Sequence, residues 1–286
     1  MPELPEVETV RRGLLPVLEN QVLETVTVRR RDLRFPIPAQ LAKRLTGATV
    51  AALDRRAKYI LMRMTNGYVA ILHLGMSGRI KIWHPGMAGM GKKPDLETHD
   101  HVIFTTDQGA MVIFNDPRRF GSLLLSSDNE LADHKLLKNL GPEPFDPAFD
   151  GAALAARLKG RNTSIKAALL DQRTVAGLGN IYVSESLFRA GISPKRLART
   201  VQGGRATKLH QAIQDVLTDA IAAGGSTLRD HRQPDGELGY FQHQFAVYDQ
   251  TGKACPGCTC SIRKTGGIKQ IVQSGRSTFY CARMQR

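Results

Sequence analysis

The chain begins Met-Pro-Glu-Leu-Pro-Glu-Val, and two of these residue types can do covalent chemistry together. Loss of Met1, which is usual when the second residue is small, would leave Pro2 as a free secondary amine. Such an amine attacks an aldehyde-level carbon and forms a cationic iminium, so it is a covalent catalyst of the Schiff-base type. An α-amino group has a reference pKa of about 7.7–8.0, which leaves a useful neutral fraction near pH 7. Glu3, next to the amine, could act as general acid and base.

The residues that follow predict a helix that would position this pair. Val7, Val10, Leu14 and Leu18 recur at three- and four-residue spacings, with charged residues between them. A helix N-terminus would lower the pKa of the amine further. The alternative interpretation is an ordinary helix start, with prolines in the first turn and acidic residues complementing the dipole.

The composition favours a polyanionic partner. Forty Lys and Arg against 26 Asp and Glu give a net charge of +14 and a pI near 9.9, which points to nucleic acid before membrane. The sequence has no dominant amphipathic basic helix, no run of about 18 apolar residues, and no apolar leader after Met1. We therefore expect a cytoplasmic, monomeric protein that binds no membrane.

Hydrophobic patterning predicts two domains. Residues 21–30 and 48–54 are typical of strands, and 59–72 contain an Asn-Gly hairpin signal, so the N-terminal domain should be rich in sheet. Three prolines and a glycine within 140–149 interrupt both the helical and the strand periodicity, so this segment is predicted to be a linker. The expected division is 1–139, the linker 140–149, 150–245, and 246–286.

Two loops punctuated by glycine follow apolar strands. The first is His73-Leu-Gly-Met-Ser-Gly and contains Met76; the second follows the strand 111–114 and contains Arg118 and Phe120. By themselves, Met76 would fill a packing gap and Phe120 would belong to the core. His99 and His101 alternate along an expected strand and could share one side of it as metal ligands. We prefer hydrogen-bonded or DNA-facing histidines there.

The second half predicts helices joined by a turn that could bind phosphate. Residues 151–160 and 163–170 are expected helices, the latter with Asn162 or Thr163 as its N-cap. The turn 175–182 has glycines at 177 and 179, which allow close backbone approach, and free amides at a helix start bind phosphate without reading sequence. A further helix should end at Gly224, before a polar stretch that we expect to be mobile up to Phe241.

The C-terminal region contains all four cysteines, at 255, 258, 260 and 281, which suits a metal site in a reducing compartment better than a disulfide framework. Expected strands at 269–273 and 277–281 flank a Ser-Gly turn and would present Arg276 at the tip.

The motifs resemble, in order, those of the formamidopyrimidine-DNA glycosylases, base-excision enzymes that remove oxidised purines. The matching segments are MPELPEVETVRRGL, RRAKY at 55–59, HLGMSG, NDPRRFG, the helical segment from Asn162 to Phe188, and the cysteine hairpin. The resemblance implies an α+β fold: an N-terminal β-sandwich with a long N-terminal helix, a helix-two-turn-helix domain, and a zinc-finger β-hairpin. Leu4 favours the purine branch, since the endonuclease VIII group opens Pro-Glu-Gly-Pro.

The resemblance also implies roles for individual residues. Pro2 would be the Schiff-base nucleophile, Glu3 the proton donor, and Glu6 a residue that positions the sugar or a water. Lys58 would contact a phosphate and the lesion. The family places a lesion-capping loop between Gly225 and Phe241. Implied DNA contacts are made by His73, Met76, His99, Arg118, Phe120, Lys166, Asn180 and Arg276.

The cysteine region departs from the family pattern of two Cys-x-x-Cys pairs. Its second pair is Cys281-Ala-Arg-Met284, and a thioether is a poor ligand for zinc. We therefore expect Cys255, Cys258, Cys260 and Cys281 to bind one structural, tetrahedral zinc ion. Three thiolates with water, a contribution from His243, or a metal-free finger are the alternatives.

The resulting hypothesis is a bifunctional DNA glycosylase and abasic-site lyase acting on duplex DNA that contains oxidised purines or abasic sites. Pro2 would displace the damaged base, and β,δ-elimination would cut the strand. One alternative is an endonuclease VIII type of enzyme that prefers oxidised pyrimidines. The other is a catalytically idle protein that only binds damaged DNA.

Overall fold

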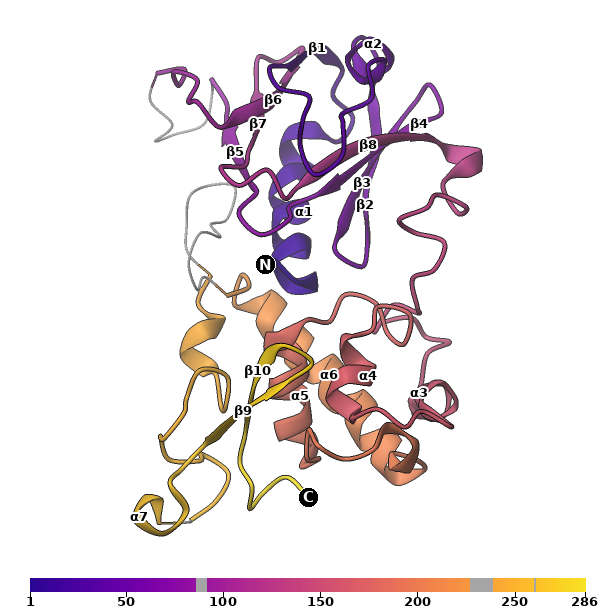
Figure 1. The fold of residues 1–286 in the computed structure, drawn as a ribbon. Coiled ribbons are helices and arrows are strands. Elements are labelled where there is room, and N and C mark those ends of the chain that lie inside the picture. The colour runs from indigo at the N-terminus through magenta and orange to yellow at the C-terminus, as the bar shows by residue number, and fades with distance from the viewer. Residues whose placement is uncertain (86–91, 227–238, 260) are drawn as a thin grey trace. The chain divides into compact units, whose positions relative to one another are not determined.

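The computed structural model describes residues 1–85, 92–226, 239–259 and 261–286 (Figure 1). The chain forms two compact units. Unit 1 comprises Met1–Lys138 with Ala223–Tyr240, and unit 2 comprises Asn139–Ala222 with Phe241–Arg286. Each unit is therefore discontinuous in sequence, and the segment 223–240 belongs to the same unit as the N-terminus.

Unit 1 contains two antiparallel four-stranded sheets, and consecutive strands of the chain do not always lie side by side. The first sheet has the order β1 (Leu23–Val28), β6 (Asp100–Thr106), β7 (Met111–Asn115), β5 (Arg79–Trp83). The second has the order β2 (Val50–Arg56), β3 (Tyr59–Met64), β4 (Tyr68–His73), β8 (Ser122–Ser127). Two short helical segments, α2 (Leu41–Leu45) and η1 (Asp128–Glu130), complete the unit.

One hydrophobic core joins both sheets to the N-terminal helix α1 (Leu4–Leu18). Alternate residues of a strand point to opposite faces, so Val102 and Phe104 of β6 reach the same core as Ile60 and Met62 of β3. The predicted helical stripe of Val7, Val10, Leu14 and Leu18 is fully buried in this core. The predicted β-sandwich with a long N-terminal helix is confirmed.

Unit 1 contains two tight turns of interest: one carries Lys58, and the other is the hairpin predicted from the Asn-Gly pair. Arg56 pairs with Tyr59 across β2 and β3, so Ala57 and Lys58 alone make the turn, and Ala57 has φ +53°. A positive φ at the first central position suits a two-residue hairpin because it matches the strand twist. The hairpin predicted at 59–72 is present, with Gly67 at φ +81°.

Unit 2 combines helices with a C-terminal hairpin. Its helices are α3 (Gly151–Leu158), α4 (Ile165–Leu170), α5 (Asn180–Ala190) and α6 (Gly204–Ala222), with short segments η2 (Ala198–Thr200), η3 (Phe241–Gln244) and α7 (Ile262–Thr265). The predicted N-cap of α4 was wrong by one or two residues, because the Ser164 hydroxyl accepts a hydrogen bond from the Ala167 amide at 3.2 Å. No helix within the described ranges is long and apolar enough to cross a membrane.

The hairpin of β9 (Lys269–Gln273) and β10 (Arg276–Tyr280) follows the prediction closely. Ser274 and Gly275 form its turn with φ values of +50° and +71°, as a type I′ turn requires. Arg276 is the first, exposed residue after this turn. Phe279 and Ile268 pack with Val247, Cys255 and Cys281 in a small core beneath the hairpin.

Candidate catalytic groups and nucleic-acid interface

The predicted nucleophile and proton donor lie at the start of α1. Pro2, Glu3 and Glu6 are all buried, and Glu3 is the N-cap residue of the helix. The Glu3 amide donates a hydrogen bond to Glu6 Oε2 at 2.8 Å. Glu6 therefore holds the backbone on which both predicted catalytic residues are mounted.

A distant segment holds the other oxygen of the same carboxylate. Ser226 donates to Glu6 Oε1 from its amide at 2.8 Å and from its hydroxyl at 3.0 Å. Gly225 has φ +79°, and a Cβ added there would lie 3.1 Å from Glu6 Cγ and from Oε1. The sequence did not predict Ser226 as a site residue; only the glycine pair that ends the preceding helix marked the place.

Lys58 and His73 lie at the same end of the second sheet. Lys58 is buried in the β2–β3 turn, and His73 ends β4 opposite Tyr59, with the two rings 4.9 Å apart. Burial, together with the positive charges of Lys58 and Arg34, lowers the pKa of His73 to about 4. The neutral His73 ring accepts the Gly75 amide proton at Nδ1 over 3.0 Å, so Nε2 carries the proton that it can offer to DNA.

A buried carboxylate on α1 secures the turn that carries Lys58. Glu8 pairs with Arg11 and Arg12 of its own helix and with Arg55 of β2 at 3.3 Å. Arg55 in turn donates to the Ala57 carbonyl at 3.0 Å. Burial raises the pKa of Glu8, but the hydrogen bonds from Arg11 and Arg12 and the charge of Arg55 outweigh it and set the pKa at about 2.

We expect Glu8→Gln to lower the free energy of unfolding of the protein by about 2 kcal/mol at pH 7. Because the folded pKa of Glu8 lies below its ordinary value of 4.5, the stabilisation is complete above pH 4.5 and is lost as the pH falls toward 2. The difference between wild type and variant should shrink over that range. Urea unfolding followed through Trp83, the single tryptophan, measures it. The exposed Glu24→Gln is the control, and a pH-independent difference would contradict the assignment.

The two predicted wedge loops do expose their apolar side chains. Met76 and Phe120 are each 43% exposed, and the Arg118 guanidinium carbon lies 4.8 Å from the centre of the Phe120 ring. The expectation from the residues alone, a gap filler and a core residue, is therefore wrong. Solvent-exposed apolar side chains at the tips of two loops are available to enter another molecule.

A cavity of 670 Å³ in unit 1 connects these loops to the start of the chain. Met1 lines it together with Gly75, Met76, Arg118 and Phe120. The remaining lining residues are Arg119 and a segment that the sequence did not predict as part of the site: Asp32, Leu33 and Arg34. The predicted nucleophile is thus preceded by a residue that faces the same space as the wedge.

The two histidines near β6 do not form a metal site. His101 is buried, and its Nε2 donates to the Asp116 carbonyl at 2.8 Å, whereas His99 is exposed. The strand is irregular between Asp100 and Val102, so the regular alternation assumed for this pair does not hold. Within the described ranges, neither histidine belongs to a group that could hold a metal ion.

In unit 2, three predicted DNA-binding residues meet at one end of β10. The Asn180 amide nitrogen donates to the Ser277 carbonyl at 3.0 Å, directly after the exposed Arg276. Lys166 donates to the same carbonyl at 2.7 Å and to the Thr278 hydroxyl at 2.6 Å. The Lys166 side chain is fully buried, so its ammonium presents no charge to solvent in this structure.

The turn before α5 is held by a pair of hydrogen bonds with the side chain of Gln172. Gly177 has φ +88°, and its amide donates to the Gln172 side chain at 2.9 Å. The Gln172 amide group donates back to the Leu178 carbonyl at 2.8 Å. Gln172 therefore fixes the turn from inside, and the residues from Thr174 to Gly179 are buried.

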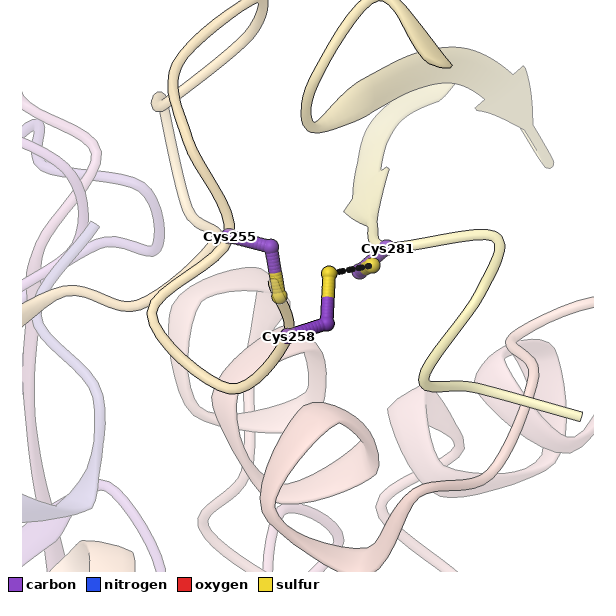
Figure 2. A group of neighbouring side chains, drawn as sticks. All are labelled: Cys255, Cys258 and Cys281. Carbon is purple, nitrogen blue, oxygen red and sulfur yellow. Dashed lines mark hydrogen bonds between the residues drawn. The ribbon is translucent and has the colours of Figure 1, made fainter. Parts of the chain in front are cut away.

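Three of the four cysteines come together beneath the hairpin. Figure 2 shows Cys255 and Cys258 on one loop, with Cys281 facing them at the end of β10. The three sulfur atoms lie within 4.8 Å of one another, and those of Cys258 and Cys281 are 3.9 Å apart. Burial raises the pKa of the Cys255 thiol. Cys260 lies outside the described residues.

Known proteins match this chain over its whole length. A model of the formamidopyrimidine-DNA glycosylase N-terminal domain matches residues 1–123, and a model of the H2TH domain of the same enzymes matches residues 140–232. A formamidopyrimidine-DNA glycosylase from Rhodospirillum rubrum is 59% identical over 286 residues, covering 100% of both chains.

Solved structures agree with this result. The MutM (FPG) protein from Thermus thermophilus matches with a TM-score of 0.84 and 36% identity, covering 99% of this chain and 98% of that chain. A Lactococcus lactis FPG variant, in complex with DNA containing Fapy-dG, matches with a TM-score of 0.87 and 32% identity over 100% of both chains. From its first residue to the cysteine hairpin, this chain belongs to the formamidopyrimidine-DNA glycosylase family.

Proposed function

We propose that this protein is a base-excision DNA glycosylase and abasic-site lyase acting on oxidised purines, including 8-oxoguanine and formamidopyrimidines, in duplex DNA. The observation that carries the proposal is the shared cavity, which Met1 lines together with the exposed Met76, Arg118 and Phe120. A nucleophile beside a wedge is what chemistry on an extruded nucleotide requires. We place this activity in the cytoplasm, in a monomer bound to DNA.

The wedge answers the first physical problem, which is access to the glycosidic carbon. A base must leave the stack before C1′ can be attacked, and unstacking costs a few kcal/mol. Met76 and Phe120 would fill the gap with apolar surface, while the planar Arg118 group would hydrogen-bond the widowed base. The exposure of all three side chains supports these roles.

After removal of Met1, the Pro2 amine attacks C1′ and the C1′–N bond to the base breaks. Glu3 delivers a proton, and opening of the sugar gives a positively charged iminium between Pro2 and C1′. Loss of the C2′ proton then expels the 3′ phosphate, and a second elimination expels the 5′ phosphate. Glu6 keeps the helix start in register through its bonds to Glu3 and Ser226.

Phosphates of the bent strand require cations and free amides along their path. Lys58 and the Nε2–H of His73 would supply donors from the second sheet of unit 1, and the exposed His99 would supply one from the residue before β6 of the first sheet. Asn180 and Arg276 would supply donors from unit 2. For Lys166 we propose a positioning role in place of direct contact. Its bonds to Ser277 and Thr278 hold the strand that begins with Arg276.

The decisive test is excision from matched duplexes carrying 8-oxoguanine, a formamidopyrimidine, or an oxidised pyrimidine at one position. Release of the purine lesions at least tenfold faster than the pyrimidine supports the proposal. A reversed preference would indicate an endonuclease VIII type of enzyme. Tight binding of the damaged duplex without any base release would indicate the idle binding protein.

We further propose that the cysteine cluster binds one structural zinc ion. Zn–S bonds of about 2.3 Å in a tetrahedron place two sulfurs about 3.8 Å apart, which the separation of the Cys258 and Cys281 sulfurs fits. We assign the fourth position to Cys260. Met284, at the position where the family pattern has a cysteine, carries a thioether, which is a poor ligand for zinc.

Zinc would hold the hairpin and take no part in the reaction. We expect one zinc per chain in the purified protein, Cys281→Ala to lose that zinc, and Met284→Ala to retain it. Metal analysis by mass spectrometry measures all three without reference to activity. Brief treatment with EDTA should leave turnover unchanged. Loss of zinc from Met284→Ala, or full zinc content in Cys281→Ala, would contradict the ligand assignment.

A further inference from the structure

The wedge side chains pose a structural problem of their own. Met76 and Phe120 are exposed, so packing cannot fix them, and they sit on loops more than forty residues apart in sequence. Base stacking in a duplex would resist the insertion of these side chains and tend to displace them. The two loops must therefore be joined behind the wedge, inside the protein.

Asp116 makes that connection. Its side chain is fully buried, and Oδ1 accepts a hydrogen bond from the Ser77 hydroxyl at 2.6 Å, next to Met76. Oδ2 accepts from the Gly121 amide at 2.7 Å, next to Phe120. One carboxylate thus binds both loops, each immediately beside a wedge residue.

The third wedge residue is tied to the same group. The Ser77 hydroxyl, which donates to Asp116, accepts a hydrogen bond from the Arg118 amide at 3.2 Å. His101 anchors the backbone of Asp116 by donating to its carbonyl at 2.8 Å. Hydrogen bonds to a buried carboxylate are stronger than neutral ones, so this arrangement is stiff.

The loops also meet backbone to backbone. A Cβ added to Gly75 would lie 2.3 Å from the Phe120 carbonyl carbon and 2.4 Å from the Gly121 amide. A Cβ at Gly121 would lie 2.6 Å from the Phe114 ring and 3.0 Å from Asp116 Oδ2. The glycines therefore permit the close approach, and the carboxylate fixes it.

We propose that Asp116, through Ser77 and Gly121, is the positioning residue that makes Met76, Arg118 and Phe120 enter the duplex as one rigid body. The inference rests on the proposed function, since it presupposes a wedge. It predicts a defect specific to base-paired substrates, because a single strand offers no stack to be opened.

Asp116→Asn tests the carboxylate with minimal change of shape. If the asparagine amide group faces the Gly121 N–H, two donors repel. If it faces Ser77, the Ser77 hydroxyl can no longer donate to residue 116, and the charge that strengthened both hydrogen bonds is absent in either case. Ser77→Ala removes the second link by a different change, and the exposed Asp107→Asn, in the turn between β6 and β7, is the matched control. We expect both test variants to lower kcat/KM on 8-oxoguanine duplex about 10- to 100-fold.

Two measurements separate positioning from general damage. Borohydride trapping on a single-stranded abasic oligonucleotide should stay within about twofold of wild type for every variant, because it needs only the Pro2 chemistry. A 2-aminopurine placed opposite a tetrahydrofuran abasic analogue in duplex should change its fluorescence on binding wild type and Asp107→Asn, and much less with Asp116→Asn or Ser77→Ala.

Equal losses on single and double strands would overturn the inference, as would a normal fluorescence change in Ser77→Ala and Asp116→Asn. If Asp116→Asn does not fold, Ser77→Ala decides alone by the same criteria. Failure of wild type to trap single-stranded abasic DNA would instead refute the proposed function. The fluorescence measurement would still test the role of Asp116 and Ser77 in that case.

Discussion

A variant that retains one extra residue before Pro2 is expected to form no borohydride-trapped adduct with abasic or 8-oxoguanine-containing DNA. In that variant the Pro2 nitrogen is an amide, which has no nucleophilic lone pair. Pro2→Gly keeps a terminal amine but loses the secondary amine that gives an iminium directly, so we expect its adduct to form about 10³-fold more slowly. Denaturing gels with labelled DNA measure the adduct after a timed reaction.

Binding of both variants to a tetrahydrofuran-containing duplex provides the control, since that analogue cannot react. Its affinity should stay near the wild-type value because Met76, Arg118 and Phe120 are unchanged. An adduct of normal yield from the extended variant would exclude Pro2 as the nucleophile and leave the new terminal amine or a lysine, of which Lys58 would be the first to replace.

Glu3→Gln should separate the two halves of the reaction. Glutamine keeps the size of the buried side chain and removes the proton that assists departure of the base, so base excision should fall about 10²- to 10⁴-fold. A preformed abasic site has already lost its base, and trapping on it should persist within about tenfold of wild type. Single-turnover assays on 8-oxoguanine duplex and abasic duplex give the two rates.

The exposed Glu24→Gln on β1 carries the same change of charge away from the site and should leave both rates unaltered. Parallel losses on the two substrates would show that Glu3 supports the helix start without donating a proton. The bond between the Glu3 amide and Glu6 does not depend on the Glu3 side chain, so it survives the substitution.

Local elements of this fold were predictable because their causes are local. The apolar spacing from Val7 to Leu18 defines the buried face of α1, and the Asn-Gly and Ser-Gly pairs supply the positive φ values that their hairpins need. Element ends were less accurate. Asn162, Thr163 and Ser164 are all good N-cap residues, and only the backbone geometry selects Ser164.

Residues that support the site were not predictable in the same way. Ser226 acts on Glu6 across 220 positions, and Asp116 acts on Ser77 across 39. Serine and aspartate occur in most loops, and the residues next to Ser226 and Asp116 do not indicate which distant side chain each one bonds. Motifs propose side chains that would face DNA, whereas the residues that hold those side chains are recognised only from their positions in the fold. Lys166 illustrates the difference: its motif implies a contact with DNA, and the structure shows its buried ammonium donating to the Ser277 carbonyl and the Thr278 hydroxyl of the hairpin.

The bond from Ser226 to Glu6 has a consequence for the newly made protein. Synthesis proceeds from the N-terminus, so Pro2, Lys58 and the wedge leave the ribosome long before residue 226. Until then the two hydrogen bonds from Ser226 to Glu6 are missing, and the helix start that bears the proposed nucleophile is less firmly held. A nascent chain should therefore remain unreactive toward abasic DNA until its final quarter has emerged. Ordering the polypeptide in this way would keep an unfinished repair enzyme from cutting the genome.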